Sequence, residues 1–130
     1  RLIQITDNLE NLSDECSSIM HTIGKFFSVY DETGKEVKPK RAKEISDYLE
    51  MVRLFYEQIC IYLSTGISSE ERMQAEVIEQ EIDNKKRELR RLSRKRIENG
   101  GDVKAELNYI DLVRKIEKAG DCVFGIVQVS

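Results

Sequence analysis

Apolar residues recur at steps of three and four along most of this chain, and this spacing limits what it can fold into. A helix brings residues three and four apart onto one face, so the steps predict amphipathic helices. The strongest stripe runs from about residue 40 to 65, so we expect its helix to be the most buried, with Phe55 in the core. That stripe consists of Ile45, Leu49, Val52, Phe55, Tyr56, Ile59, Tyr62 and Leu63.

Further apolar stripes predict helices near residues 2–24, 69–99 and 102–128. The first of these stripes consists of Ile5, Leu9, Leu12, Cys16, Ile19 and Ile23. The stripe of the 69–99 helix is thinner and consists of Ala75, Ile78, Ile82, Leu89 and Leu92. Long helices joined by short loops are typical of an all-α, antiparallel up-and-down helical bundle.

Local signals mark where these helices begin and end. Gly66 ends the second helix, and Ser68 with Glu71 three residues later has the pattern of a capping box that starts the third. The glycine pair at residues 100–101 stops the third helix, because glycine accepts the left-handed conformation at a helix end. Asp102 then suits the N-cap of the fourth helix.

The segment between the first two helices has a different character. Residues 25–39 are polar and turn-rich and end in a proline, so we expect a linker with room for a small β-hairpin around residues 32–35. The chain starts at Arg1 inside a helical pattern, which indicates a piece of a longer protein.

Composition narrows the class of protein. With 35% charged and 40% hydrophobic residues, the chain can build a modest core beneath a charged surface. Its apolar runs are shorter than the about 20 residues that span a bilayer, and no signal peptide is recognisable. The three cysteines lie far apart and lack zinc-site spacing, so we expect reduced thiols in a cytosolic protein.

Two segments near opposite ends of the chain resemble each other. Residues 9–19, LENLSDECSSI, align with residues 116–126, IEKAGDCVFGI, at an offset of 107 positions. Glu10 falls on Glu117 and Asp14 falls on Asp121, while the apolar positions change conservatively. A repeat of this period would be a whole supersecondary unit rather than a short solenoid motif.

The repeated acidic pairs are candidate metal ligands. Glu10 and Asp14 share one helix face, as do Glu117 and Asp121, because four residues separate each pair. Two carboxylates at this spacing suit hard or borderline cations. The first pair lies away from its apolar stripe, so any metal should bind on the surface, between helices. A buried di-iron centre is not expected, since the di-iron pattern E-x-x-H does not occur and His21 is the single histidine.

The 69–99 helix ends in a basic run, KKRELRRLSRKR, which carries eight positive charges in twelve residues. Such a run complements the negative end of the helix dipole. It could also contact an anionic surface, such as phospholipid, phosphate or an acidic partner. The candidate contact residues are Lys86, Arg87, Arg90, Arg91, Arg94 and Lys95. Nucleic acid is not expected, since no recognised binding motif and no interleaved aromatic residues accompany the run.

The sequence offers no recognisable catalytic constellation. It contains no arguable Ser-His-Asp or Cys-His arrangement, and we expect His21 to be structural or exposed. The glycine pair at residues 100–101 follows a helix rather than a strand, which is not the setting of a phosphate-binding loop. We therefore do not expect an enzyme.

The two related segments resemble the signature of the PhoU family, whose tandem three-helix repeats carry a motif close to LERIGDHAxNIAE on their last helix. Here LENLSDECSSIM and IEKAGDCVFGIV stand at those positions. The resemblance implies the signature helix of one repeat in residues 1–24 and a complete three-helix repeat in residues 40–130. The segment EIDNKKRELRRLSRKRIENGG is similar to the corresponding helix in the C-terminal PhoU-like domains of bacterial sodium–phosphate cotransporters.

In that family, the Glu and Asp of the two signatures help to hold metal clusters on the bundle surface. The resemblance implies divalent or transition-metal ligands at Glu10, Asp14, Glu117 and Asp121, with Glu79 and Asp83 of the neighbouring helix as further contributors. This sequence departs from the signature at Glu15 and Cys122, where the family has histidine.

The resemblance implies a non-catalytic regulatory or accessory domain of a sodium-dependent phosphate cotransporter, at the cytoplasmic face of the inner membrane. Its expected partner is the transmembrane part of the same parent chain, with a homo-oligomer and an anionic lipid surface as further candidates. Two alternatives stay open: a free-standing PhoU-type phosphate-signalling regulator, and a plain helical scaffold or oligomerisation module.

Overall fold

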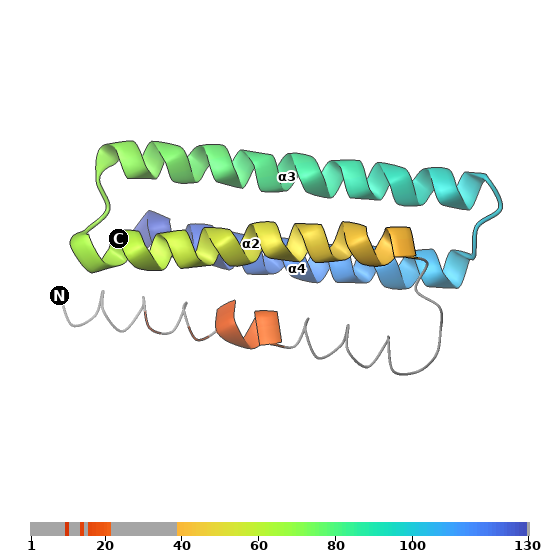
Figure 1. The fold of residues 1–130 in the computed structure, drawn as a ribbon, viewed down its shortest axis with the longest axis horizontal. Helices are drawn as coiled ribbons and strands as arrows, with labels where there is room; N and C mark the ends of the chain where they lie inside the picture. Colours follow the sequence, from red (N-terminus) through yellow and green to blue (C-terminus); the bar gives the residue numbers. More distant parts are fainter. Residues whose placement is uncertain (1–9, 11–13, 15, 22–38, 130) are drawn as a thin grey trace.

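A computed structural model describes residues 10, 14, 16–21 and 39–129 of the chain (Figure 1). Three long helices lie side by side and alternate in direction: α2 (Pro39–Thr65), α3 (Ser69–Glu98) and α4 (Val103–Val129). The described residues before α2 are also helical, and no strand occurs among the residues that the structure describes. The predicted all-α, antiparallel bundle is confirmed. The predicted linker and its hairpin lie outside the described residues, except for Pro39, which begins α2.

The helix ends agree with the predicted ends to within one residue. Gly66 and Gly100 have positive φ angles of 83° and 84°, the left-handed conformation that glycine adopts without a steric penalty. The chain can therefore reverse direction sharply at these two positions, and α3 and α4 can fold back on their predecessors.

The two predicted N-caps are both present. The hydroxyl of Ser68 accepts a hydrogen bond from the backbone N–H of Glu71, whose carboxylate accepts one from the N–H of Ser68, completing the capping box. Oδ1 of Asp102 accepts hydrogen bonds from the backbone N–H groups of Lys104 and Ala105. These bonds satisfy donors that have no partner inside the helix.

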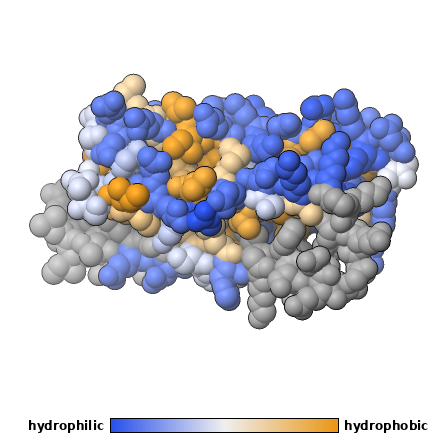
Figure 2. Space-filling model, viewed as in Figure 1, coloured by the Kyte–Doolittle hydropathy of each residue, from blue (hydrophilic) through white to orange (hydrophobic). Residues whose placement is uncertain are grey.

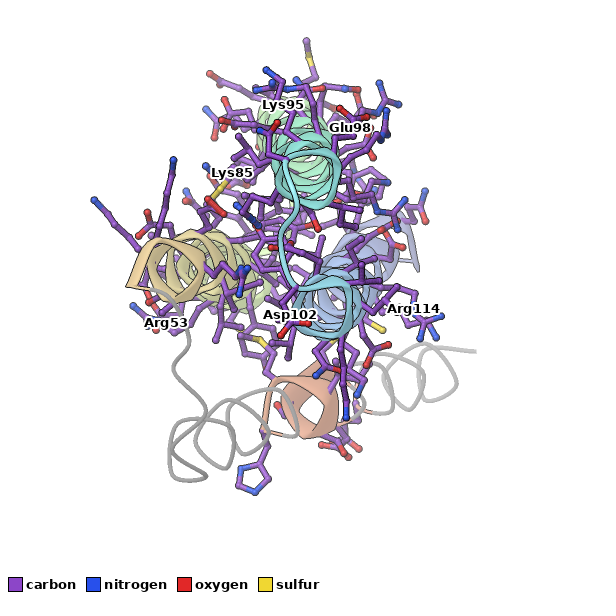
Figure 3. All side chains as sticks on the ribbon, turned by 90° about the vertical axis from the view of Figure 1, so that its right-hand side faces the viewer. Arg53, Lys85, Lys95, Glu98, Asp102 and Arg114 are labelled. Atoms are coloured by element: carbon purple, nitrogen blue, oxygen red, sulfur yellow. The ribbon has the colours of Figure 1, made fainter. Side chains whose placement is uncertain are left out.

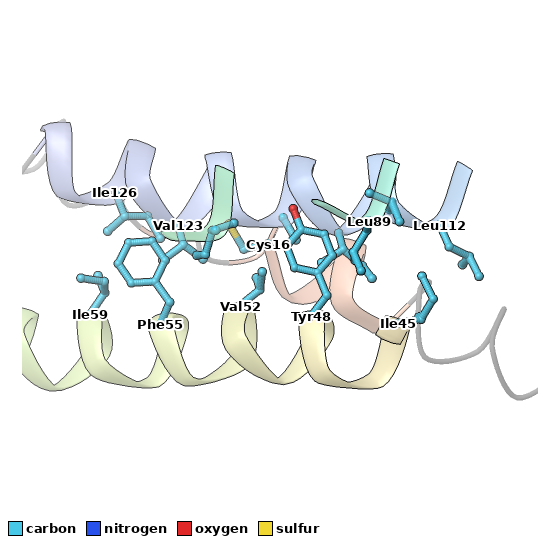
Figure 4. Packing of buried hydrophobic residues seen from close by; sticks show 14 of the residues in the cluster. Cys16, Ile45, Tyr48, Val52, Phe55, Ile59, Leu89, Leu112, Val123 and Ile126 are labelled. Carbon is cyan, nitrogen blue, oxygen red and sulfur yellow. The ribbon is translucent and has the colours of Figure 1, made fainter. Parts of the chain in front are cut away.

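A single apolar core runs along the bundle axis (Figure 4). Phe55, only 2% exposed, lies in its middle as predicted, and the 40–65 stripe is buried or half-buried along its length. The prediction that this helix is the most buried is wrong, because α4 supplies more buried apolar side chains than α2. The α4 set consists of Tyr109, Leu112, Val113, Ile116, Ala119, Val123, Ile126 and Val127.

The physical reason is that α4 packs more extensively on the other two long helices than α2 does. A Cβ atom placed on Gly120 would lie 3.5 Å from Ile82 of α3 and 3.8 Å from Val52 of α2. Small residues on this face let both helices approach α4 closely, so a wide sector of its surface is covered.

The described residues of the first segment pack against this bundle. Cys16 is fully buried in the core, and Ile19 and Met20 pack against it. Ser17 Oγ lies 3.4 Å from the hydroxyl of Tyr56 on α2. Figure 3, an end-on view, shows this segment on the side of the bundle away from α3. None of the described helices has a stretch long and apolar enough to cross a membrane.

Candidate functional site

Four of the six predicted metal-ligating carboxylates gather where α3 packs on α4. Glu79 and Asp83 come from α3, and Glu117 and Asp121 come from α4. A side-chain hydrogen bond joins Glu79 to Asp121, and the ammonium of Lys86 joins Asp83 to Glu117. We call these four carboxylates the acidic seam.

Helix geometry explains why the acidic seam forms. The two carboxylates on each helix are four residues apart and share a face. Because α3 and α4 are antiparallel, the earlier residue of one pair meets the later residue of the other: Glu79 meets Asp121, while Glu117 lies near Asp83. The spacing in the sequence and the direction of the helices together place four negative charges in one seam.

Lys86 supplies the positive charge that this seam needs. Its Nζ lies 2.8 Å from Oδ1 of Asp83 and 3.0 Å from Oε1 of Glu117, and its side chain is only 15% exposed. Its hydrogen bond with Asp83 raises the pKa of Lys86 and lowers the pKa of Asp83. Arg87 and Arg90 reinforce the arrangement, 3.1 Å from Asp83 and 3.7 Å from Glu117 respectively.

Glu79 and Asp121 form the other half of the acidic seam, away from the ammonium. Burial raises the pKa of Glu79 to about 7, with further contributions from the charge of Asp121 and the hydrogen bond to it. Burial also raises the pKa of Asp121. Oε2 of Glu79 is buried and has no hydrogen-bond partner among the described residues. A carboxyl–carboxylate hydrogen bond needs one proton, so this pair favours a half-protonated state near neutral pH.

Tyr48 approaches the acidic seam from α2. Its side chain is fully buried, and its hydroxyl finds no hydrogen-bond partner within the described part of the chain. Burial, followed by the four seam carboxylates, raises its pKa, so the phenol stays neutral. Figure 4 shows its ring directed from α2 into the core beside Leu89. The buried ring of Tyr48 therefore bounds the seam on its inner side.

These side chains do not fit a metal ion. Within the described residues, no group of three or more His, Cys, Asp or Glu side chains is arranged to hold one. An ion placed between Asp83 and Glu117 would compete with the ammonium of Lys86 for the same oxygens. The seam thus carries its own cation and, on Glu79 or Asp121, its own proton.

The structure does not bring the remaining predicted ligands to this seam. Glu10 and Asp14 are exposed. They belong to the first segment, whose described part lies on the side of the bundle away from α3 (Figure 3). Their outward orientation agrees with the expectation from the helical wheel. The six carboxylates therefore do not form one site.

Residues that align at an offset of 107 positions are similarly buried or exposed in the structure. Cys16 and Val123, which align, are both fully buried, and Asp14 and Asp121, which also align, are both exposed. The described part of the first segment and α4 thus turn equivalent positions toward the core and toward solvent.

The predicted anion-contacting residues divide into two groups. Lys86, Arg87 and Arg90 pair with carboxylates of the acidic seam. The other three are exposed and form no ion pair with any described residue, and they are Arg91, Arg94 and Lys95.

A second polar cluster, which the sequence interpretation missed, lies at the end of the bundle where α3 turns into α4. Glu106 is fully buried there, accepting hydrogen bonds from Ser93 at 2.6 Å and from Arg96 at 2.7 Å, with Arg41 also 2.7 Å away. Arg96 in turn binds Glu44 at 3.0 Å. We call these five residues the Glu106 cluster.

Electrostatics stabilise the ionised form of Glu106 in spite of its burial. Burial opposes its ionisation, but the hydrogen bonds from Arg96 and Ser93 outweigh that effect and lower its pKa. The guanidinium of Arg96 also lies 4.7 Å from the ring centre of Tyr109. The sequence does hold one signal for this cluster: Glu106 is in helical phase with the buried residue Val113, seven positions later.

Comparison of this chain with protein-family models, with curated proteins and with solved structures gives no match.

Proposed function

We propose that this chain is a non-catalytic regulatory domain, PhoU-like in type, which belongs to a sodium-dependent phosphate cotransporter and lies at the cytoplasmic face of the membrane. The observation that carries the proposal is the repeat. Two segments with the same acidic spacing, 107 residues apart, turn equivalent positions toward the core and toward solvent.

The state of the acidic seam supports a structural rather than a chemical role. A catalytic carboxylate must be able to reach a substrate, whereas Asp83 and Glu117 both contact Lys86, and Glu79 is bonded to Asp121. Tyr48, which bounds the seam on its inner side, is fully buried and leaves no approach from that direction. We therefore assign the seam to holding α3 on α4.

Contact with the transmembrane part of the parent chain would use an apolar surface, and the outward side of α2 carries exposed apolar residues (Figure 2). Leu54 and Ile61 of α2 are large apolar side chains that stand exposed. Monomeric proteins rarely gather such side chains on one face without a partner. This surface would serve equally for docking on the transporter and for association of two copies.

Sodium-dependent phosphate uptake by the intact parent protein, reconstituted in vesicles, tests the proposal. We expect wild-type uptake to respond to phosphate on the cytoplasmic side, and Leu54→Asp with Ile61→Asp to keep uptake but lose that response. The matched control is Glu50→Gln with Glu57→Gln, also exposed on α2. A parent protein without sodium-dependent phosphate transport would contradict the proposal.

A further inference from the structure

We propose that the outward face of α3 binds an anionic phospholipid bilayer. The residues of this face, which we call the α3 ridge, are Met73, Val77, Arg87, Arg91, Arg94 and Lys95. The inference goes beyond the regulatory role proposed above, because it requires only a membrane with anionic headgroups and not a phosphate transporter.

The ridge is a band of side chains along the outward side of a straight helix. Met73 and Arg91 are 18 positions apart, as are Val77 and Lys95. Since about 3.6 residues make one turn, 18 residues make five full turns and bring each pair to the same angle around the axis. The two apolar side chains thus stand in line with the cations, about 27 Å further toward the start of the helix.

The charges of the ridge are free to meet a partner. Arg91, Arg94 and Lys95 are exposed and have no ion pair within the described residues. Arg87 is exposed and shares Asp83 with Lys86. Lys86 and Arg90 point into the acidic seam and take no part. Five exposed acidic residues flank the ridge, and one of them, Glu88, lies 3.7 Å from Lys85. The five are Glu70, Glu76, Glu81, Glu88 and Glu98.

The shape of the ridge fits a flat surface. α3 forms one edge of the bundle, and the first segment lies on the opposite side (Figures 1 and 3). No described element covers its outward face. A ridge of this kind has no groove in which a peptide or a single phosphate group could be enclosed, but it can lie along a bilayer over many headgroups.

The apolar end of the ridge favours a bilayer over other anionic partners. Met73 is 66% exposed and Val77 is 58% exposed, and both would face the same surface as the cations. Interfacial helices combine basic residues with apolar ones in this way, because a bilayer offers anionic headgroups and an apolar layer beneath them. A nucleic acid would meet the cations but would gain little from Met73 and Val77, and the ridge has no aromatic residue on which a base could stack.

Flotation of the purified protein with vesicles tests the inference. The probes are vesicles of phosphatidylcholine alone and vesicles that also contain phosphatidylglycerol. Wild type should float with the second kind only, and less so as the salt concentration rises. The test variant carries Arg91→Gln, Arg94→Gln and Lys95→Gln. Each cation near an anionic surface strengthens binding about five-fold, so this variant should bind roughly 100-fold more weakly.

The control variant carries Lys43→Gln, Lys104→Gln and Lys118→Gln, which remove the same charge from exposed positions on α2 and α4. It should bind within about two- to three-fold of wild type, since only residues near the membrane gain from its surface potential. Circular dichroism checks that both variants unfold at the wild-type temperature. Met73→Ser with Val77→Ser should weaken vesicle binding and leave binding to a DNA duplex unchanged.

Three results would overturn the inference. The first is no binding of wild type to anionic vesicles at low salt. The second is equal weakening in the ridge variant and the control variant, which would show a response to net charge alone. The third is tighter binding to the DNA duplex than to the vesicles, which would assign the ridge to nucleic acid.

Discussion

The ammonium of Lys86 on α3 lies 3.0 Å from Oε1 of Glu117 on α4, in a seam that also holds Asp83, Glu79 and Asp121. This contact determines whether the acidic seam attracts metal ions. A carboxylate cluster without an internal cation would attract metal ions, whereas this one neutralises part of its charge with a residue of its own fold.

The first prediction concerns that internal cation. Lys86→Met keeps a long apolar stem but leaves Asp83 and Glu117 facing Glu79 and Asp121 with less compensation. We expect the variant to unfold at a lower temperature and to regain stability when Mn²⁺ or Mg²⁺ is added, because an ion that binds only the folded state stabilises it. Thermal unfolding with and without each metal measures this.

Wild type should show no metal-dependent shift in the same experiment. Asp14→Asn with Asp121→Asn serves as a further comparison, since it removes one carboxylate from each repeated segment. A wild-type shift that disappears in this double variant would contradict the assignment of Lys86 as the cation of the seam.

The second prediction concerns pH. The pKa of Glu79 is raised from 4.5 to about 7, so the folded protein holds a proton that the unfolded chain releases at lower pH. The resulting stability is complete below about pH 4.5 and is lost as the pH rises through about 7. Because Glu79 is partly exposed, we expect a loss of only about 1 to 2 kcal/mol between about pH 5 and pH 8.

Urea unfolding across this pH range measures the loss. Glu79→Gln should flatten the slope only in part, because the pKa of Asp121 is also raised and acts in the same direction. The lowered pKa of Asp83 acts in a more acidic window, where stability falls as the pH falls. Glu76→Gln, an exposed change on the same helix, should keep the wild-type slope. An unchanged slope in Glu79→Gln would show that another group titrates.

The third prediction concerns the core and compares two neighbours. Phe55 is 2% exposed and Leu54 is 52% exposed. Phe55→Ala should lower the free energy of unfolding by about 3 to 5 kcal/mol, because it removes buried apolar surface and leaves a cavity. Leu54→Ala should cost under about 1 kcal/mol. Chemical denaturation that gave similar losses for both would mean that the Phe55 pocket collapses or that α2 packs in a different rotation.

The fourth prediction concerns the Glu106 cluster. Glu106→Gln keeps the shape of the side chain but removes the charge that Arg41 and Arg96 share. Leaving buried guanidinium groups with too little negative charge should cost about 3 to 5 kcal/mol. The control is Glu98→Gln, an exposed change close by in α3, which should be nearly neutral. A small loss in Glu106→Gln would indicate that water reaches Arg41 and Arg96.

The helices could be predicted closely from the sequence because their ends depend on local chemistry. Gly66, Gly100, Ser68 and Asp102 each act within a few residues, through backbone angles or capping bonds. The extent to which each helix is buried could not be predicted in the same way. The stripe on α2 is stronger in sequence, but burial depends on how closely neighbouring helices cover a face, and α4 packs more extensively on its neighbours than α2 does.

The candidate site was predictable only in part for a related reason. Spacing placed Glu117 beside Asp121 and Glu79 beside Asp83, since such pairs belong to single helices. The pairing of Lys86 with Glu117 depends on how α3 lies on α4, which no local pattern contains. Glu106 was missed because a glutamate on a helix is typically part of a solvated face, and its burial is a property of the bundle as a whole.

The Glu106 cluster also has a consequence for how the helices are aligned along the bundle axis. Apolar stripes repeat every turn, so α4 could slide past α2 and α3 by about 5.4 Å and still bury a similar stripe. After a slip in one direction, Ile110 would take the place of Glu106, and Arg41 and Arg96 would lose the carboxylate that they share. A slip in the other direction would offer them only the shorter side chain of Asp102, which caps the start of α4. The cluster therefore fixes the position of α4 along the bundle axis, because it gives one of several nearly equivalent alignments a lower free energy than the rest.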